Sequence, residues 1–228
     1  MGPPTGAYPV AVDNPVALVP IWVEIIAAVI GGIVGALMAA RERFDINGAL
    51  IAAIVTGLGG GMIRDVLSGD VPVALTSPWL LAAATVAGLL TFVFSRQVDF
   101  VHGKAKPLLT ILDAVFLAQY TVMGVARAMN HDLPFLSCVF LGVITGVGGG
   151  VLRDMVLGRT PDVLRPGTLE AGASVVGAVI QTAVALLAAP IVGFFTGLVV
   201  IITVRLLSVW LHWETPPARI AARDQPPK

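Results

Sequence analysis

Long apolar stretches separated by short polar ones dominate the chain. Each stretch is about 20 residues long, which is the length that a helix needs to cross the hydrocarbon core of a bilayer. Seven such stretches can be delimited, at residues 17–40, 46–67, 78–96, 108–129, 133–156, 169–188 and 191–211. The pattern therefore predicts an all-α membrane protein with seven transmembrane helices.

Part of this pattern is written twice. Residues 56–75 have the sequence Thr-Gly-x-Gly-Gly-Gly-x-x-Arg-Asp-x-x-x-Gly-x-x-Pro-x-x-Leu. Residues 145–164 repeat this phrase at an offset of 89 residues, so that Gly59 corresponds to Gly148. The offset continues upstream without a gap, where Glu24 falls on Asp113. Because each copy has three spans, the second must enter the membrane from the opposite face. We predict two inverted three-helix repeats, related by a pseudo-two-fold axis in the membrane plane, plus an unpaired seventh helix.

This duplication divides the chain into segments. We expect a flexible N-terminal tail at 1–16, a first three-helix repeat at 17–97, a basic cytoplasmic loop at 98–106, a second repeat at 107–189, a seventh helix at 190–212 and a flexible cytoplasmic tail at 213–228.

Composition agrees with a membrane protein, and the basic residues orient it. Hydrophobic residues make up 57% and charged residues 12% of the chain, against roughly 25% charged in soluble proteins; mean hydropathy is +0.91.

With seven spans, 12 of the 14 Lys and Arg residues fall on one side of the membrane, and only Arg64 and Arg127 fall on the other. The positive-inside rule then places the N-terminus outside and the C-terminus in the cytoplasm, in a multi-pass inner membrane protein.

The glycine triplets of the repeated phrase are the first candidate functional elements. Each glycine costs a helix about 1 kcal/mol relative to alanine, so three in a row favour a break or kink in the second and fifth helices. Unwound backbone inside a membrane must face protein or a water-filled cavity. An alternative is that the glycines only allow two helices to pack closely. The candidate kink or pore residues are Gly59, Gly60, Gly61, Gly148, Gly149 and Gly150, with Thr56 and Thr145 one turn earlier.

Charged residues inside the apolar stretches are the second candidate element. A charge at the centre of a bilayer costs roughly 2.5–3.5 kcal/mol on insertion scales, so such groups need partners. We predict two equivalent ion pairs, Glu24 with Arg64 and Asp113 with Arg153, with Asp65 and Asp154 beside them. These pairs either hold the bundle together or flank a polar route and set its charge selectivity.

Several functions find no support in the sequence. The glycine clusters lack the last glycine of a dinucleotide-binding loop, because position 62 is Met62 and position 151 is Val151. The three histidines have no metal-ligand spacing, and Cys138 is the single cysteine. We therefore expect no enzyme activity, no cofactor, no metal site and no nucleic-acid partner.

Read together, these motifs resemble the bacterial branch of the trimeric intracellular cation (TRIC) channels. The resemblance covers roughly residues 20–210, and the doubled Gly-Gly-Gly-x-x-Arg-Asp phrase makes it specific. It implies a seven-span protomer with two inverted repeats, kinked at the triplets. It also implies a homotrimer with one pore in each protomer, permeable to monovalent cations, chiefly potassium, and gated by voltage, with membrane lipids as its surroundings.

Three functions remain in competition. The first is a passive cation channel. The second is a transporter for a small zwitterion such as glycine, since some bacterial relatives have been regarded as glycine transporters; half-helix amino termini after the triplets would then hold its carboxylate. The third is a membrane scaffold in which the glycines only pack helices.

Overall fold

A computed structural model describes residues 20–95, 106–164, 169–211 and 213. The expected tails at 1–16 and 213–228 and the basic loop at 98–106 lie almost entirely outside these residues. The helices are α1 (Ile21–Arg41), α2 (Ile46–Leu67), α3 (Val73–Thr76), α4 (Pro78–Ser95), α5 (Lys106–Asn130), α6 (Phe135–Val156), the 3-10 turn η1 (Asp162–Leu164), α7 (Glu170–Leu187) and α8 (Pro190–Trp210).

Each of the seven apolar stretches corresponds to one long helix, and the described residues contain no strand. Six of these helices are long and apolar enough to cross a membrane, and the apolar helix α4 is shorter. The protein is therefore an all-helical membrane protein with six clear apolar spans. The short helices α3 and η1 were not predicted.

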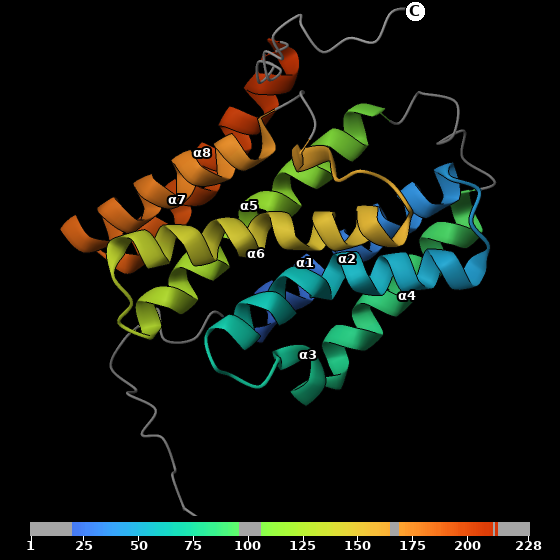
Figure 1. The fold of residues 1–228 in the computed structure, drawn as a ribbon, viewed down its shortest axis with the longest axis horizontal. Helices are drawn as coiled ribbons and strands as arrows, with labels where there is room; N and C mark the ends of the chain where they lie inside the picture. Colours follow the sequence, from blue (N-terminus) through green and yellow to red (C-terminus); the bar gives the residue numbers. More distant parts are fainter. Residues whose placement is uncertain (1–19, 96–105, 165–168, 212, 214–228) are drawn as a thin grey trace, which may run out of the picture.

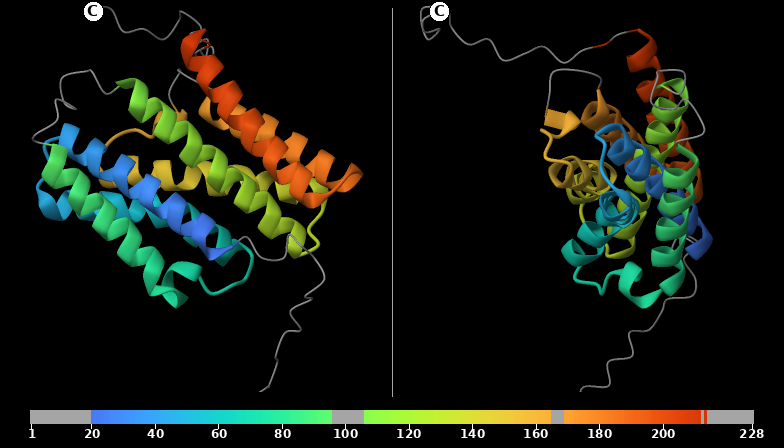
Figure 2. Two further views of the ribbon diagram at one scale, coloured as in Figure 1. Left: turned by 180° about the vertical axis from the view of Figure 1, so that it is seen from behind. Right: turned by 90° about the vertical axis from the view of Figure 1, so that its right-hand side faces the viewer.

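The helices form two layers. Figure 1 shows α2 and α6 side by side along the middle of the molecule and running in opposite directions. Seen from behind in Figure 2, α4, α1, α5 and α8 lie next to one another as a second layer. Helix α7 packs against α6, α5 and α8.

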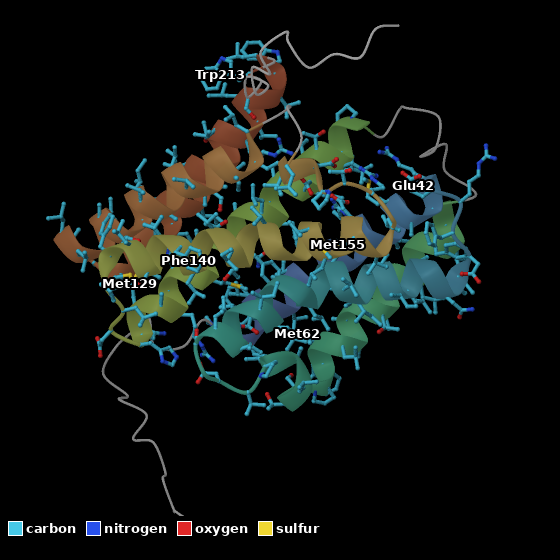
Figure 3. The ribbon with its side chains drawn as sticks, in the orientation of Figure 1. Glu42, Met62, Met129, Phe140, Met155 and Trp213 are labelled. Atoms are coloured by element: carbon cyan, nitrogen blue, oxygen red, sulfur yellow. The ribbon has the colours of Figure 1, made fainter. Side chains whose placement is uncertain are left out.

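The outer surface is apolar, as the lipid environment requires. Figure 3 places Met62 on α2 and Phe140 and Met155 on α6 at the surface of the α2–α6 layer, where 38%, 60% and 62% of these residues are exposed. All four tryptophans are exposed near helix ends: Trp22 and Trp79 at the starts of α1 and α4, and Trp210 and Trp213 at the end of α8. Tryptophan is enriched at both membrane–water interfaces.

Helices α2 and α6 cross at the glycine triplets, and the contact is reciprocal. A Cβ on Gly60 would collide with the backbone oxygen of Thr145, and a Cβ on Gly149 would lie 2.6 Å from that of Thr56. The two contacts are related by the offset of 89 residues. Only a hydrogen atom at these positions allows the backbones to come so close.

The triplets predict a break or a kink, and no break is present in α2 or α6; the kink stays a prediction. Both α2 and α6 remain α-helical from end to end through their three glycines. The intrinsic cost of glycine favours a break in the helix. The close contact between α2 and α6, which glycine permits, stabilises both helices and opposes that cost.

The two copies of the phrase also end in the same way. Gly69 after α2 and Gly158 after α6 adopt positive φ angles of 78° and 70°. Such a left-handed residue commonly follows a helix and turns the chain away from its axis. Both helices are thus followed by the same turn, which returns the chain toward the Arg-Asp pair.

Candidate functional site: two charge clusters at one helix crossing

The first charge cluster lies at the C-terminal end of α2 and consists of Glu24, Arg64 and Asp65. Arg64 Nη2 donates a hydrogen bond of 3.0 Å to Glu24 Oε1, across from α2 to α1. Arg64 Nε donates to Asp65 Oδ1 at 2.8 Å. Only 2% of Arg64 and 1% of Asp65 is exposed, so each buried charge has the opposite charge that it needs. The side chains expected to pair, Glu24 and Arg64, do lie together.

Asp65 also holds the chain that follows α2. Its second oxygen, Oδ2, accepts a hydrogen bond of 2.9 Å from the backbone N–H of Val73 at the start of α3. Near this segment, Asp70 contacts Arg127 at 3.0 Å and His131 at 2.9 Å. Because Arg127 and His131 belong to the end of α5 and the turn after it, these contacts join the two repeated units at this end of the molecule.

The second charge cluster, Asp113, Arg153 and Asp154, repeats this arrangement at the end of α6. Arg153 Nε donates to Asp154 Oδ1 at 2.9 Å, and Asp154 Oδ2 accepts from the backbone N–H of Asp162 at 3.0 Å. Arg153 Nη1 lies 3.8 Å from Asp113 Oδ1, a looser contact than the Glu24–Arg64 pair. Since α2 and α6 run in opposite directions, the two clusters lie at opposite ends of the crossing.

Arg205 on α8 belongs to the second cluster, and sequence analysis missed it. Its Nη2 lies 3.3 Å from Asp113 Oδ2 and also donates a hydrogen bond to Glu170 on α7. Asp113 is therefore shared between two arginines, which explains its looser contact with Arg153. Arg205 is only 5% exposed, although it stands in an apolar stretch without a copy in the duplication. A single charge inside a predicted seventh span was the signal that could have found it.

The three glycines of each triplet differ in their surroundings. Gly60 and Gly149 are buried at the helix crossing, and Gly59 faces the side chain of Leu152. Gly61 and Gly150 are partly exposed, and a Cβ there would meet no atom nearer than 3.4 Å and 3.8 Å. These third glycines therefore leave room for a small side chain beside the two arginines.

At the first cluster this space is a pocket. It is lined by Glu24, Leu58, Gly61, Met62, Arg64, Asp65, Val73, Ala74, Leu80 and Tyr120. The lining combines two carboxylates, a guanidinium and apolar side chains, and the space is about the size of one water molecule. The described residues contain no cluster of three His, Cys, Asp or Glu side chains that could hold a metal ion.

Thr56 and Thr145 do not line open space. Each is fully buried, and each hydroxyl donates to a carbonyl one turn earlier in its own helix, Thr56 to Ala52 at 2.6 Å and Thr145 to Leu141 at 2.5 Å. Such bonds often bend a helix slightly. The threonines therefore shape the crossing through their backbone oxygens, which lie against the glycines of the opposite helix.

Comparisons with known proteins find matches along nearly the whole chain. The family described as "Glycine transporter" matches residues 21–96 and 110–186. The UPF0126 inner membrane protein YadS of Escherichia coli K12 is 35% identical over 198 residues, covering 86% of this chain and 94% of that protein. The UPF0126 membrane protein YvgT of Bacillus subtilis is 30% identical over 197 residues, covering 85% and 93%.

The fold matches solved structures of TRIC channels. One, determined to explain conductance through TRIC cation channels, is 31% identical with a TM-score of 0.79 and covers 90% of this chain and 100% of that one. The TRIC trimeric intracellular cation channel orthologue from Rhodobacter sphaeroides is 30% identical with a TM-score of 0.76, covering 83% and 97%. Fold, coverage and identity agree with the doubled Gly-Gly-Gly-x-x-Arg-Asp phrase, and the chain is a bacterial member of the TRIC channel family.

Proposed function

We propose that this protein is a potassium-permeable cation channel whose route runs inside each protomer, past the α2–α6 crossing. The two charge clusters carry this proposal. Counted with the groups that contact them, each cluster has three carboxylates and two arginines, which leaves one formal negative charge in excess at either end of the crossing. The groups are Glu24, Asp65, Asp70, Arg64 and Arg127 at one end and Asp113, Asp154, Glu170, Arg153 and Arg205 at the other. Negative potential at both entrances of a low-dielectric passage concentrates cations and repels anions.

The third glycines support the same route. Gly61 and Gly150 leave space next to Arg64 and Arg153, so an ion that approaches from either end meets a carboxylate before it meets the closed crossing. The reciprocal α2–α6 contact supports two inverted repeats around this crossing. In the membrane, the basic residues favour an N-terminus outside and a cytoplasmic C-terminus, which would place the first cluster toward the outer face.

Assembly and gating extend the proposal. The similar protein from Rhodobacter sphaeroides is described as trimeric, which supports a homotrimer with one route per protomer, surrounded by membrane lipids in the cytoplasmic membrane. Light scattering corrected for detergent should give three times the 23.6 kDa chain mass; a monomeric or dimeric mass would contradict it. Voltage gating follows from the family resemblance.

Glycine transport is the second candidate, because the matching family is described as a glycine transporter. The mechanism considered from sequence needs half-helix amino termini at the triplets, but α2 and α6 are continuous there. A bound glycine carboxylate would have to use Arg64 or Arg153, and both guanidinium groups already bind carboxylates. The site therefore favours a cation.

Purified protein in planar bilayers tests the two candidates. We expect single-channel steps in potassium chloride, with a reversal potential that follows the potassium gradient. Parallel uptake of radiolabelled glycine into proteoliposomes should not exceed uptake into empty liposomes. Saturable glycine uptake without current steps would contradict the channel and support the transporter.

A further inference from the structure

Two aromatic side chains of α5 occupy the space between the charge clusters. Asp113, Phe116 and Tyr120 follow at intervals of three and four residues and so share one face of α5. Asp113 belongs to the second cluster, whereas Tyr120 lines the pocket of the first. Phe116 and Tyr120 thus fill the stretch of about 10 Å that seven helical residues span.

The two rings pack directly against glycines of both triplets. A Cβ on Gly149 would lie 3.1 Å from Phe116 Cζ, and one on Gly61 would lie 3.4 Å from Tyr120 Cε1. The ring centroids are 4.8 Å apart, and 3% of Phe116 and 2% of Tyr120 is exposed. The rings therefore form a continuous apolar layer across the crossing.

One hydrogen bond fixes this layer. The Tyr120 hydroxyl donates to the backbone oxygen of Gly57 on α2, and the bond is buried. It ties α5 to the helix that carries the first triplet.

The two rings are present in only one of the two duplicated units. At the offset of 89 residues, Phe116 and Tyr120 correspond to Ala27 and Gly31 in the first unit. These small residues of α1 make room for the rings, since a Cβ on Gly31 would lie only 2.6 Å from Phe116 Cε2. The Phe116 and Tyr120 rings of the second unit thus fill the space that the small residues Ala27 and Gly31 of the first unit leave free.

We propose that Phe116 and Tyr120 are the residues that close the cation route, and that the hydrogen bond from Tyr120 to Gly57 holds them in the closed position. This inference rests on the proposed channel function. An apolar constriction stops ions because it cannot replace their water of hydration. The pocket beside Gly61 lies on the Arg64 side of this layer, next to the Tyr120 ring.

Planar-bilayer recording of three variants tests this assignment. Tyr120→Phe keeps the ring but removes the hydrogen bond, and the ratio of open to closed time should rise about fivefold, which corresponds to about 1 kcal/mol for one hydrogen bond. Phe116→Ala opens the layer itself and should give a larger increase, with current at voltages where the wild type is silent. Leu117→Ala is the matched control, because Leu117 is a buried α5 residue that packs with Ala173 of α7 and Ile201 of α8.

The outcomes separate the inference from the proposed function. Raised open probability in Tyr120→Phe and Phe116→Ala, but not in Leu117→Ala, supports the closure. Wild-type gating in folded Tyr120→Phe protein, or equal changes in all three variants, overturns it while leaving the channel in place. Absence of current from the wild type and from every variant overturns the channel, and the closure with it. Tyr120→Phe removes only one hydroxyl, so it keeps the test available if Phe116→Ala fails to fold.

Discussion

At the residue scale, neighbouring glycines of one triplet should respond oppositely to the same substitution. Gly60→Ala places a Cβ against the backbone oxygen of Thr145, and such overpacking costs about 1–3 kcal/mol. Gly61→Ala meets nothing nearer than 3.4 Å, and alanine favours the helix by about 1 kcal/mol. Thermal unfolding followed by circular dichroism should show a lower Tm for Gly60→Ala only. Equal Tm shifts would mean that α2 and α6 do not cross as described.

The two ion pairs should couple to different extents. Glu24 binds Arg64 at 3.0 Å, whereas Asp113 lies 3.8 Å from Arg153 and is shared with Arg205. Coupling in a double-mutant cycle of Glu24→Gln with Arg64→Gln should reach about 1–3 kcal/mol. The cycle of Asp113→Asn with Arg153→Gln should give less, because Arg205 still neutralises Asp113. Strictly additive changes in the first cycle would reject the pair.

At the element scale, helix α8 should depend on one buried ion pair for its position. Arg205→Gln leaves Glu170 without its arginine and Asp113 with Arg153 alone, and breaking a buried pair costs about 3–5 kcal/mol. The double variant Glu170→Gln, Arg205→Gln removes both charges and should recover part of the lost Tm. Arg159→Gln is a control, because its contacts with Glu42 and Asp162 are more exposed and such pairs contribute about 0–1 kcal/mol. An Arg205→Gln protein as stable as this control would show that α8 does not need the pair.

The helices show which parts of this structure the sequence can predict. The stretch at 46–67 coincides with α2, and the stretch at 133–156 differs from α6 only at its start, because a span needs a long continuous apolar run. The four residues of α3 are too few to show a helical period. Glu24 and Arg64 could be paired in advance because the duplication gave their counterparts.

The missed features have a common physical cause. Whether three glycines break a helix depends on what packs against them, and the contact with Thr145 becomes visible only in three dimensions. The same holds for Arg205, because α8 has no copy that would have drawn attention to it. The packing of the Phe116 and Tyr120 rings against both glycine triplets likewise depends on contacts that only the fold brings together.

At the scale of the whole molecule, the orientation in the membrane can be tested with one cysteine. In a Cys138→Ser background, a cysteine placed in the loop at 97–106 should react with an impermeant maleimide only in inverted vesicles, because the positive-inside rule predicts a cytoplasmic location for this basic loop. Labelling in intact cells would contradict both the orientation and the number of spans.

The route itself is tested most directly by cysteines at the third glycines. Gly61→Cys and Gly150→Cys, each in the Cys138→Ser background, place a thiol beside Arg64 and Arg153, where a Cβ fits without a collision. A cationic methanethiosulfonate reagent should reduce the potassium current of Gly61→Cys from one side of the bilayer and that of Gly150→Cys from the opposite side, whereas an anionic reagent should react more slowly at both. Full wild-type current from protein shown by mass to be modified at these positions would contradict a cation route past the α2–α6 crossing.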